Sequence, residues 1–389
     1  MTLRQKIERE IGECGPIPFS RYMERCLFDP EYGYYSCHAG QFGKAGDFYT
    51  SSDVHAVFGR LLARQFEEMW RALGSPGEME ILELGPGRGL FAQDVLDWSE
   101  KKFPEFFRAV HYSLAESSRA LRERLPQTLS RHFGAGKASL VGADTGPAFG
   151  GPGADSIERA LGPEAPLLVF ANEFFDALPV EVLSSEGELR ISAENGRFLE
   201  TWAPASDEEL NFLDRYGVHP EAGERMEAPL IAQRHMSRIA ATVPRGFVIA
   251  IDYGYTRAEQ LAGRHRGTVM AFRRHSSSTN PYEAPGEQDI TAHVNLTALS
   301  AAAEQNRMTV HRPLTQSQFL LGIGQTNQFA DAFEPCQLPQ ERAKVALQLK
   351  HLATPAGMGE TFQVLVASKG VGAEEVANLS GLSFSRGPR

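Results

Sequence analysis

The stretch ELGPGRG (residues 83–89) is the part of the sequence that decides the fold. Three glycines and a proline are crowded into this stretch, directly after the apolar run at 79–82. In an open α/β sheet, ligands bind at the carboxyl ends of the strands. Glycines at such an end let the backbone approach a ligand without a Cβ clash. The stretch therefore predicts a buried strand followed by a ligand-binding loop.

Two classes of ligand compete for this loop. A dinucleotide fingerprint counted from Gly85 reaches Leu90 at the position where a third glycine normally permits close helix packing. The pattern present is instead E-x-G-x-G-x-G, with Glu83 at the strand end, and it favours S-adenosylmethionine. The next candidate strand ends in Glu116, whose carboxylate can accept hydrogen bonds from both ribose hydroxyls. A tight structural turn beside an exposed Glu116 is the competing interpretation.

A second polar group follows a buried run in VFANEFFDALPVEV (residues 169–182). Asn172, Glu173 and Asp176 lie where this strand ends, next to the first strand of the predicted sheet, so they are expected to face the ligand of the glycine loop. The alternative is a helix with Asn172 as its N-cap and the two acids complementing its dipole. In IDYGY, Asp252 follows another apolar run, and a simple turn with Asp252 as local acceptor is an equally good interpretation.

Helix and strand patterns alternate along the chain. Apolar spacing predicts helices over 3–11, 53–73 and 90–99, and short apolar runs predict strands over 78–84, 110–116, 166–173 and 247–254. Residues 207–239 are polar and are also expected to be helical. The alternation indicates an α/β fold with a doubly wound, mainly parallel, Rossmann-like sheet.

The same patterns divide the chain into four expected units. These are an N-terminal helical cap with a cofactor-closing loop at 1–75, a Rossmann-like core at 76–200, a helical insertion at 201–245, and the rest of the sheet at 246–389. An inserted lid or substrate segment at 256–301 is expected within the last unit.

Composition narrows the class of protein. The 389 residues, 42% of them apolar, can build a sizeable core, and 39 basic against 49 acidic side chains give a net charge of -10. This balance argues against a nucleic acid or an anionic membrane as the main partner. The first residues lack the apolar core of a signal peptide, and no apolar run approaches membrane-spanning length. We therefore expect a soluble, cytoplasmic protein without membrane insertion.

The cysteines point to a reducing compartment. They form no CxxC pair, and free thiols are a better interpretation than a structural zinc site. The four positions are Cys14, Cys26, Cys37 and Cys336.

Several longer motifs resemble those of a known family, the MidA-like S-adenosylmethionine-dependent methyltransferases. The motifs are, in chain order, GDFYTSSDVHAVFGRLLARQ, ELGPGRGLFAQDVL, NEFFDALPV, IDYG, RGTVMAFRRH with DITAHVNL, TQSQFLLGIG and MGETFQVL. The resemblance covers nearly the whole chain. It implies a class I methyltransferase fold and S-adenosyl-L-methionine as cofactor. It also implies methylation of a protein arginine, since the mitochondrial member is an arginine methyltransferase needed for assembly of respiratory complex I.

The resemblance implies which residues bind the cofactor. GDFYTS is expected to close over it from the amino-terminal side, and 142–166, more glycine-rich than in relatives, holds the adenine-side contact. The expected cofactor-binding residues are Asp47, Thr50, Glu83, Gly85, Pro86, Gly87, Gly89, Glu116, Ser117, Asp144, Asn172 and Glu173.

The expected catalytic residues are Glu173, Asp176 and Asp252. Methyl transfer requires an acceptor nitrogen aligned with the methyl carbon. An arginine acceptor is fully charged, and paired carboxylates can hold it by bidentate hydrogen bonds and take the released proton. Four aromatic residues are candidates for a wall, with at least half expected in the core instead: Phe174, Phe175, Tyr253 and Tyr255. His293 is expected on a substrate-side helix.

Three functions remain compatible with the sequence. The first is a protein arginine methyltransferase acting on a respiratory complex I subunit or its bacterial counterpart. The second is an S-adenosylmethionine-binding assembly factor with weak or no catalysis. The third, a nicotinamide-dependent oxidoreductase, is disfavoured by Leu90 in the third-glycine position.

Overall fold

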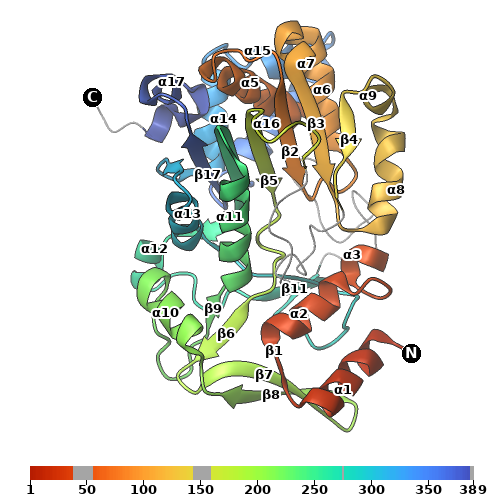
Figure 1. The fold of residues 1–389 in the computed structure, drawn as a ribbon, viewed down its shortest axis with the longest axis vertical. Coiled ribbons are helices and arrows are strands. Elements are labelled where there is room, and N and C mark those ends of the chain that lie inside the picture. The colour runs from red at the N-terminus through yellow and green to blue at the C-terminus, as the bar shows by residue number, and fades with distance from the viewer. Residues whose placement is uncertain (38–55, 143–158, 274–275, 386–389) are drawn as a thin grey trace.

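A large central sheet organises the molecule (Figure 1). The computed structural model describes residues 1–37, 56–142, 159–273 and 276–385. Within them the sheet runs in the order β15-β17-β10-β5-β2-β3-β4. The parallel strands are β2 (Met79–Leu84), β3 (Val110–Ala115), β4 (Ala138–Leu140), β5 (Leu167–Asn172) and β10 (Gly246–Tyr255), and β17 (Phe362–Lys369) is antiparallel to β10. The predicted doubly wound, mainly parallel sheet is confirmed.

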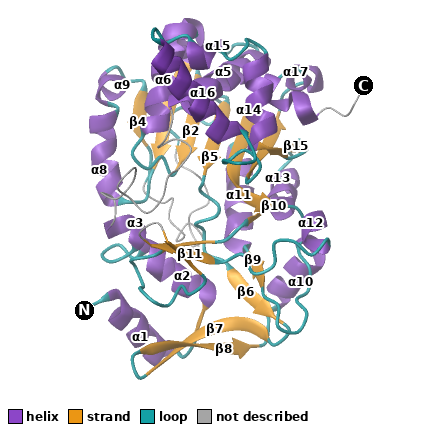
Figure 2. Ribbon diagram, turned by 180° about the vertical axis from the view of Figure 1, so that it is seen from behind, coloured by secondary structure: helices purple, strands orange, loops and turns teal. Residues whose placement is uncertain are grey.

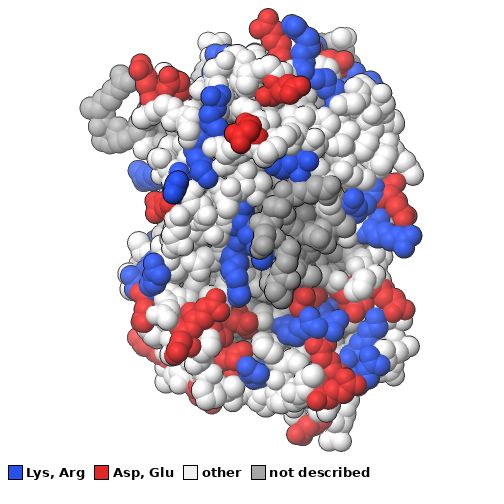
Figure 3. All heavy atoms as spheres, viewed as in Figure 1, with Lys and Arg blue, Asp and Glu red and all other residues white. Residues whose placement is uncertain are grey.

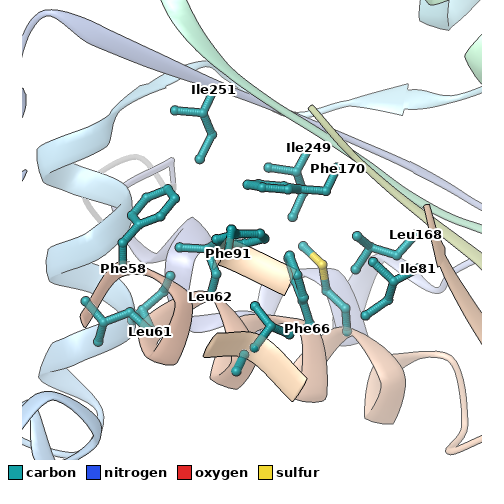
Figure 4. Close-up of a cluster of buried hydrophobic side chains, with 14 of the residues drawn as sticks. Phe58, Leu61, Leu62, Phe66, Ile81, Phe91, Leu168, Phe170, Ile249 and Ile251 are labelled. Carbon is teal, nitrogen blue, oxygen red and sulfur yellow. The ribbon is translucent and has the colours of Figure 1, made fainter. Parts of the chain in front are cut away.

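Helices cover both faces of this sheet, as the apolar strands require. Successive residues of β5 alternate between two cores: Leu168 and Phe170 belong to one and Val169 to the other. The first core is packed by α5 (Ala56–Ala72), α6 (Leu90–Lys102) and α14 (Gln316–Gln325), and the second by α11 (Leu230–Thr242) and α13 (Leu296–Gln305). In Figure 4, Phe91 of α6 lies against Phe170, with ring centroids 4.4 Å apart.

A smaller sheet lies below the large one, as Figure 2 shows from behind. It contains β1 (Ile17–Pro18), β6 (Glu181–Ser184), β7 (Gly187–Glu194), β8 (Arg197–Ala203) and β9 (Met226–Ala228). A three-stranded sheet, β11 (Met270–Arg273), β12 (Ser276–Ser278) and β13 (Asp289–Thr291), lies beside it. One apolar cluster joins both to α1 (Leu3–Cys14), α2 (Phe19–Phe28) and α3 (Tyr34–Cys37).

Two expectations about the middle of the chain differ from the structure. Residues 181–203, grouped with the 76–200 core from the sequence, pair within the smaller sheet. The β7–β8 hairpin turns at Asn195 and Gly196, both with positive φ, and Asn-Gly is a strong hairpin signal that could have been read from the sequence. The helix expected over 207–239 is wrong in part, because Pro229 ends β9 and separates α10 (Asp207–Tyr216) from α11. Helix α11, placed in an insertion from the sequence, packs on the large sheet.

The remaining elements complete the two layers. They are α7 (Pro104–Ala109), α8 (Arg119–Thr128), α9 (Ser130–Gly134), α12 (Arg257–Leu261), β14 (Val294–Asn295), β15 (Thr309–Val310), β16 (Leu314–Thr315), α15 (Ala330–Phe333), α16 (Pro339–Ala353), α17 (Ala373–Ala377) and η2 (Ser380–Ser385). All four cysteines are free thiols, as predicted. None of the described helices combines the length and the apolar character needed to cross a membrane.

Candidate active site

The glycine loop between β2 and α6 adopts a backbone that side chains rarely permit. Gly85, Gly87 and Gly89 have φ values of 65°, 54° and 75°. The Gly85 N–H donates to the Ala115 carbonyl of β3 at 2.9 Å, and the Gly89 N–H donates to the Pro86 carbonyl at 2.9 Å. A Cβ on Gly89 would lie 2.7 Å from Leu125. Left-handed backbone and close packing explain the glycines.

Glu116 ties this loop to the end of β3. Its carboxylate accepts the Gly87 N–H at 3.1 Å and the Ser118 N–H at 2.8 Å, with the half-buried Ser117 between. Burial raises the pKa of Glu116 to about 7, and the backbone N–H groups oppose this rise. The interpretation as an exposed residue beside a structural turn is wrong, because Glu116 is buried.

Glu83 lies at the end of β2 and is also buried. It accepts a hydrogen bond from the Tyr112 hydroxyl of β3 at 2.9 Å. Burial raises the pKa of Glu83 to about 8, Tyr112 opposes that rise, and the Glu116 carboxylate adds to it. The two acids therefore form one buried acidic pair under the loop.

The chain turns sharply after β5. Glu173 has a φ of 51°, uncommon for a side chain of its size, and its N–H donates to the Ile251 carbonyl at 2.9 Å. Asn172 Nδ2 donates to Glu173 Oε1 at 3.1 Å, whereas Asn172 Oδ1 is buried with no partner among the described residues. No helix begins here, so the N-cap alternative is wrong.

Asp252 of β10 organises this turn. Its Oδ2 accepts the backbone N–H groups of Phe174, Phe175 and Asp176 at 3.2, 2.8 and 3.3 Å. Its Oδ1 accepts the Tyr253 N–H at 3.0 Å. Three successive N–H groups around one carboxylate form an anion nest. The expectation that Asp252 contacts an acceptor is corrected, because both oxygens are engaged in positioning the turn. The simple-turn interpretation is also incomplete, since β10 continues to Tyr255.

Asp176 brings a carboxylate from the turn to the smaller sheets. It is buried, and burial together with the carboxylates of Asp252 and Asp289 raises its pKa well above the ordinary value. Asp289 of β13 accepts a hydrogen bond from the Tyr35 hydroxyl of α3 at 2.8 Å. The sequence reasoning missed Asp289 and Tyr35, although both lie in motifs it singled out, YGYYS and DITAHV.

Comparison with known proteins places this geometry in a family. A family model described as S-adenosyl-L-methionine-dependent methyltransferase matches residues 61–314. The chain belongs to this family. It is 29% identical to the protein arginine methyltransferase NDUFAF7 homolog, mitochondrial, of Drosophila melanogaster, over 99% of this chain and 89% of that one. It is 28% identical to the protein arginine methyltransferase NDUFAF7, mitochondrial, of Mus musculus, over 91% and 81%.

A solved methyltransferase-family structure agrees with this placement. The protein is from Burkholderia thailandensis and is bound to S-adenosyl-homocysteine. It superimposes with a TM-score of 0.81 at 28% identity, covering 100% of this chain and 95% of that one. The fold expected from the sequence, a class I methyltransferase sheet, is confirmed, and the nicotinamide alternative is set aside.

The cofactor of this methyltransferase is S-adenosyl-L-methionine, and the residues at the edge of the sheet fit it. No described atom lies within 4 Å of a Cβ built on Gly87, which leaves room for a ligand beside the loop. Each Glu116 oxygen keeps a lone pair beyond its backbone bond for a ribose hydroxyl. The buried Asn172 Oδ1 offers an acceptor that the described protein atoms do not satisfy. Asp47, Thr50 and Asp144 lie outside the described residues.

The aromatic candidates divide as expected. Phe175 and Tyr255 are core residues, 2% and 0% exposed. Phe174 is half-buried, and its ring lies 3.3 Å from a Cβ built on Gly85, so it links the turn after β5 to the glycine loop. Tyr253 is half-buried and its ring lies nearly parallel to that of His293.

His293 differs from its expected setting. It lies between β13 and β14, not on a helix, and its Nδ1 is 3.1 Å from Nδ1 of His265. Burial lowers the pKa of His293 to about 4, and the neighbouring His265 lowers it further. A neutral histidine pair beside Tyr253 follows from this geometry.

Proposed function

We propose that this methyltransferase transfers its methyl group to an arginine of a protein. The observation that carries the proposal is the set of buried carboxylates at the ends of β5 and β10, beside the glycine loop. Asp176 and Asp252 are 4% and 2% exposed, and neither forms an ion pair with a lysine or arginine within the part of the chain that the structure describes. Buried carboxylates are costly without a cation, and a guanidinium supplies one.

The reaction sets two demands on the residues at the turn. When bound, S-adenosyl-L-methionine supplies an electrophilic methyl group, so that an N–C bond forms as the C–S bond breaks and the acceptor nitrogen loses one proton. Glu173 and Asp176 hold the guanidinium by charge-assisted hydrogen bonds and localise its charge away from the reacting nitrogen. Glu173 accepts the released proton. The strained backbone at Glu173, held by Ile251 and by the Asp252 nest, fixes these carboxylates before the acceptor arrives.

The surroundings support a basic protein segment as acceptor. The chain carries a net charge of -10. On the face shown in Figure 3, acidic side chains gather on the lower part of the molecule, with basic ones between them. The curated relatives reported above carry the name protein arginine methyltransferase. A respiratory complex I subunit or its bacterial counterpart is the acceptor that the family resemblance implies, and we include it in the proposal.

The test is methyl transfer to a host lysate and to arginine peptides. The protein is incubated with methyl-labelled S-adenosyl-L-methionine, and mass spectrometry locates the label. We expect methylarginine. Label on another residue type would overturn the arginine assignment. Cofactor binding with no transfer to any protein would instead support an assembly factor without catalysis.

A variant tests the role of Glu173. Glu173→Gln keeps the shape of the side chain but removes its charge and its capacity to take a proton. We expect turnover to fall roughly 100-fold or more, with the cofactor Kd nearly unchanged. The control is Glu164→Gln, at an exposed glutamate, which should leave both quantities unchanged. Turnover of Glu173→Gln at the wild-type rate would refute the assignment.

A further inference from the structure

Two segments far from the turn in sequence meet the carboxylates that follow β5. The Ala292 N–H, just after β13, donates to the Asp176 carbonyl at 3.0 Å. Helix α3 and the sheet of β11 to β13 lie side by side between the two larger sheets (Figures 1 and 2). This arrangement brings Asp289 and Tyr35 to the acceptor side of the site.

Asp176 and Asp289 form a buried pair of like charges. They are 4% and 5% exposed, and the Asp289 carboxylate raises the pKa of Asp176. Two carboxylates at this depth repel each other unless a proton or a cation lies between them. The pair adjoins the cofactor loop through Phe174, whose ring lies 3.3 Å from a Cβ built on Gly85. It therefore belongs to the methyl-transfer site rather than to a separate acidic cluster.

Tyr35 sets the orientation of Asp289. Its hydroxyl donates to Asp289 Oδ1 at 2.8 Å, and it comes from a different segment of the chain, so the carboxylate plane is fixed from outside β13. A planar carboxylate held in one orientation suits a planar, bidentate donor such as a guanidinium. An ammonium group, a point charge on a flexible stem, gains less from it.

We propose that Asp289 binds the acceptor guanidinium opposite Asp176, and that Tyr35 is a positioning residue that orients Asp289. The inference rests on the proposed arginine methylation and adds the second wall of the acceptor pocket. The N-terminal cap and the 256–301 insertion thereby take part in selecting arginine.

Peptide binding to the full-length protein saturated with S-adenosyl-homocysteine tests this without catalysis. Two peptides are compared by calorimetry, one with arginine and one with citrulline, the neutral isostere. We expect wild type to prefer arginine by roughly 100-fold, and Asp289→Asn to reduce this preference at least about tenfold. Tyr35→Phe should reduce it by about three- to tenfold. The affinity for S-adenosyl-homocysteine should stay unchanged in both variants.

A tyrosine elsewhere provides the matched control. Tyr282 donates its hydroxyl to Glu200 at 2.8 Å and packs in the same apolar cluster as the cap. Tyr282→Phe should keep the wild-type preference for arginine. A purely structural role for Tyr35 or Asp289 would weaken both peptides alike and overturn the proposal.

Failure of the inference and failure of the proposed function give different results. Wild type that does not distinguish arginine from citrulline contradicts arginine methylation itself. Wild type that distinguishes them, with full preference kept in Asp289→Asn, contradicts only the role of Asp289. If Asp289→Asn does not fold, Tyr35→Phe decides, and a wild-type preference in that variant overturns the proposal.

Discussion

Cofactor affinity should depend on pH through Glu116. Burial raises the pKa of this carboxyl group to about 7 in the free protein. Ribose hydroxyls are hydrogen-bond donors, and they bind the ionised carboxylate better than the protonated acid. Binding therefore favours loss of the Glu116 proton. The sign follows directly: affinity is fully developed above pH 7 and is lost as pH falls below it.

The size of the effect follows from the same pKa. With a pKa of about 7, roughly one molecule in ten has Glu116 ionised at pH 6, and about nine in ten at pH 8. The dissociation constant should therefore fall about tenfold between pH 6 and pH 8, which corresponds to about 1.4 kcal/mol. Binding at pH 6 should release nearly one proton, and binding at pH 8 only about a tenth of one.

Titration calorimetry with S-adenosyl-homocysteine measures both quantities, because buffers of different ionisation enthalpy report the released proton. Glu116→Gln should bind more weakly and show a nearly flat pH profile. Glu181→Gln is the matched control, because burial also raises the pKa of Glu181 to about 7, but Glu181 lies in the smaller sheet. An affinity that stays constant or falls as pH rises, or a slope that survives in Glu116→Gln, would refute the reasoning.

Three further predictions concern the loop, the turn and the buried acids. Gly87→Val should weaken S-adenosyl-homocysteine binding roughly ten- to a hundredfold by calorimetry, since φ is 54° at this position, whereas Gly77→Val at an exposed glycine should not. Asp252→Asn should lower methyl transfer about tenfold or more with a smaller change in cofactor Kd, because the nest loses its ionised acceptor; Asp331→Asn, at a buried acid paired with Arg64, controls for lost stability. The free energy of unfolding of the free protein, measured in urea, should fall as pH rises towards 8, because the pKa of Glu83 is raised from 4.5 to about 8 on folding. Its contribution is fully present below pH 4.5, and Glu83→Gln should flatten this dependence.

Much of the cofactor side could be predicted from the sequence because its signals are local. The three positive φ values of the glycine loop require the residues that stand there. The apolar runs of β2, β5 and β10 indicated a parallel sheet, and strand ends in such a sheet meet at one edge. Glu116 and the turn at Asn172 and Glu173 were placed beside the loop by that rule alone. The smaller sheet was missed, because its strands are short and pair with segments distant in the chain.

The sequence by itself determined the sheet, the glycine loop and the acids at the strand ends, since each rests on a run of neighbouring residues. Only the tertiary structure decided what each acid does. Asp252 became the support of a turn because three N–H groups from another strand end converge on it. Asp289 and Tyr35 joined the site because α3 and β13 pack together across more than two hundred residues of chain, with |i−j| of 254. Hydrogen-bond partners and burial depend on such long-range packing, and they are what separates a positioning carboxylate from one that binds the acceptor.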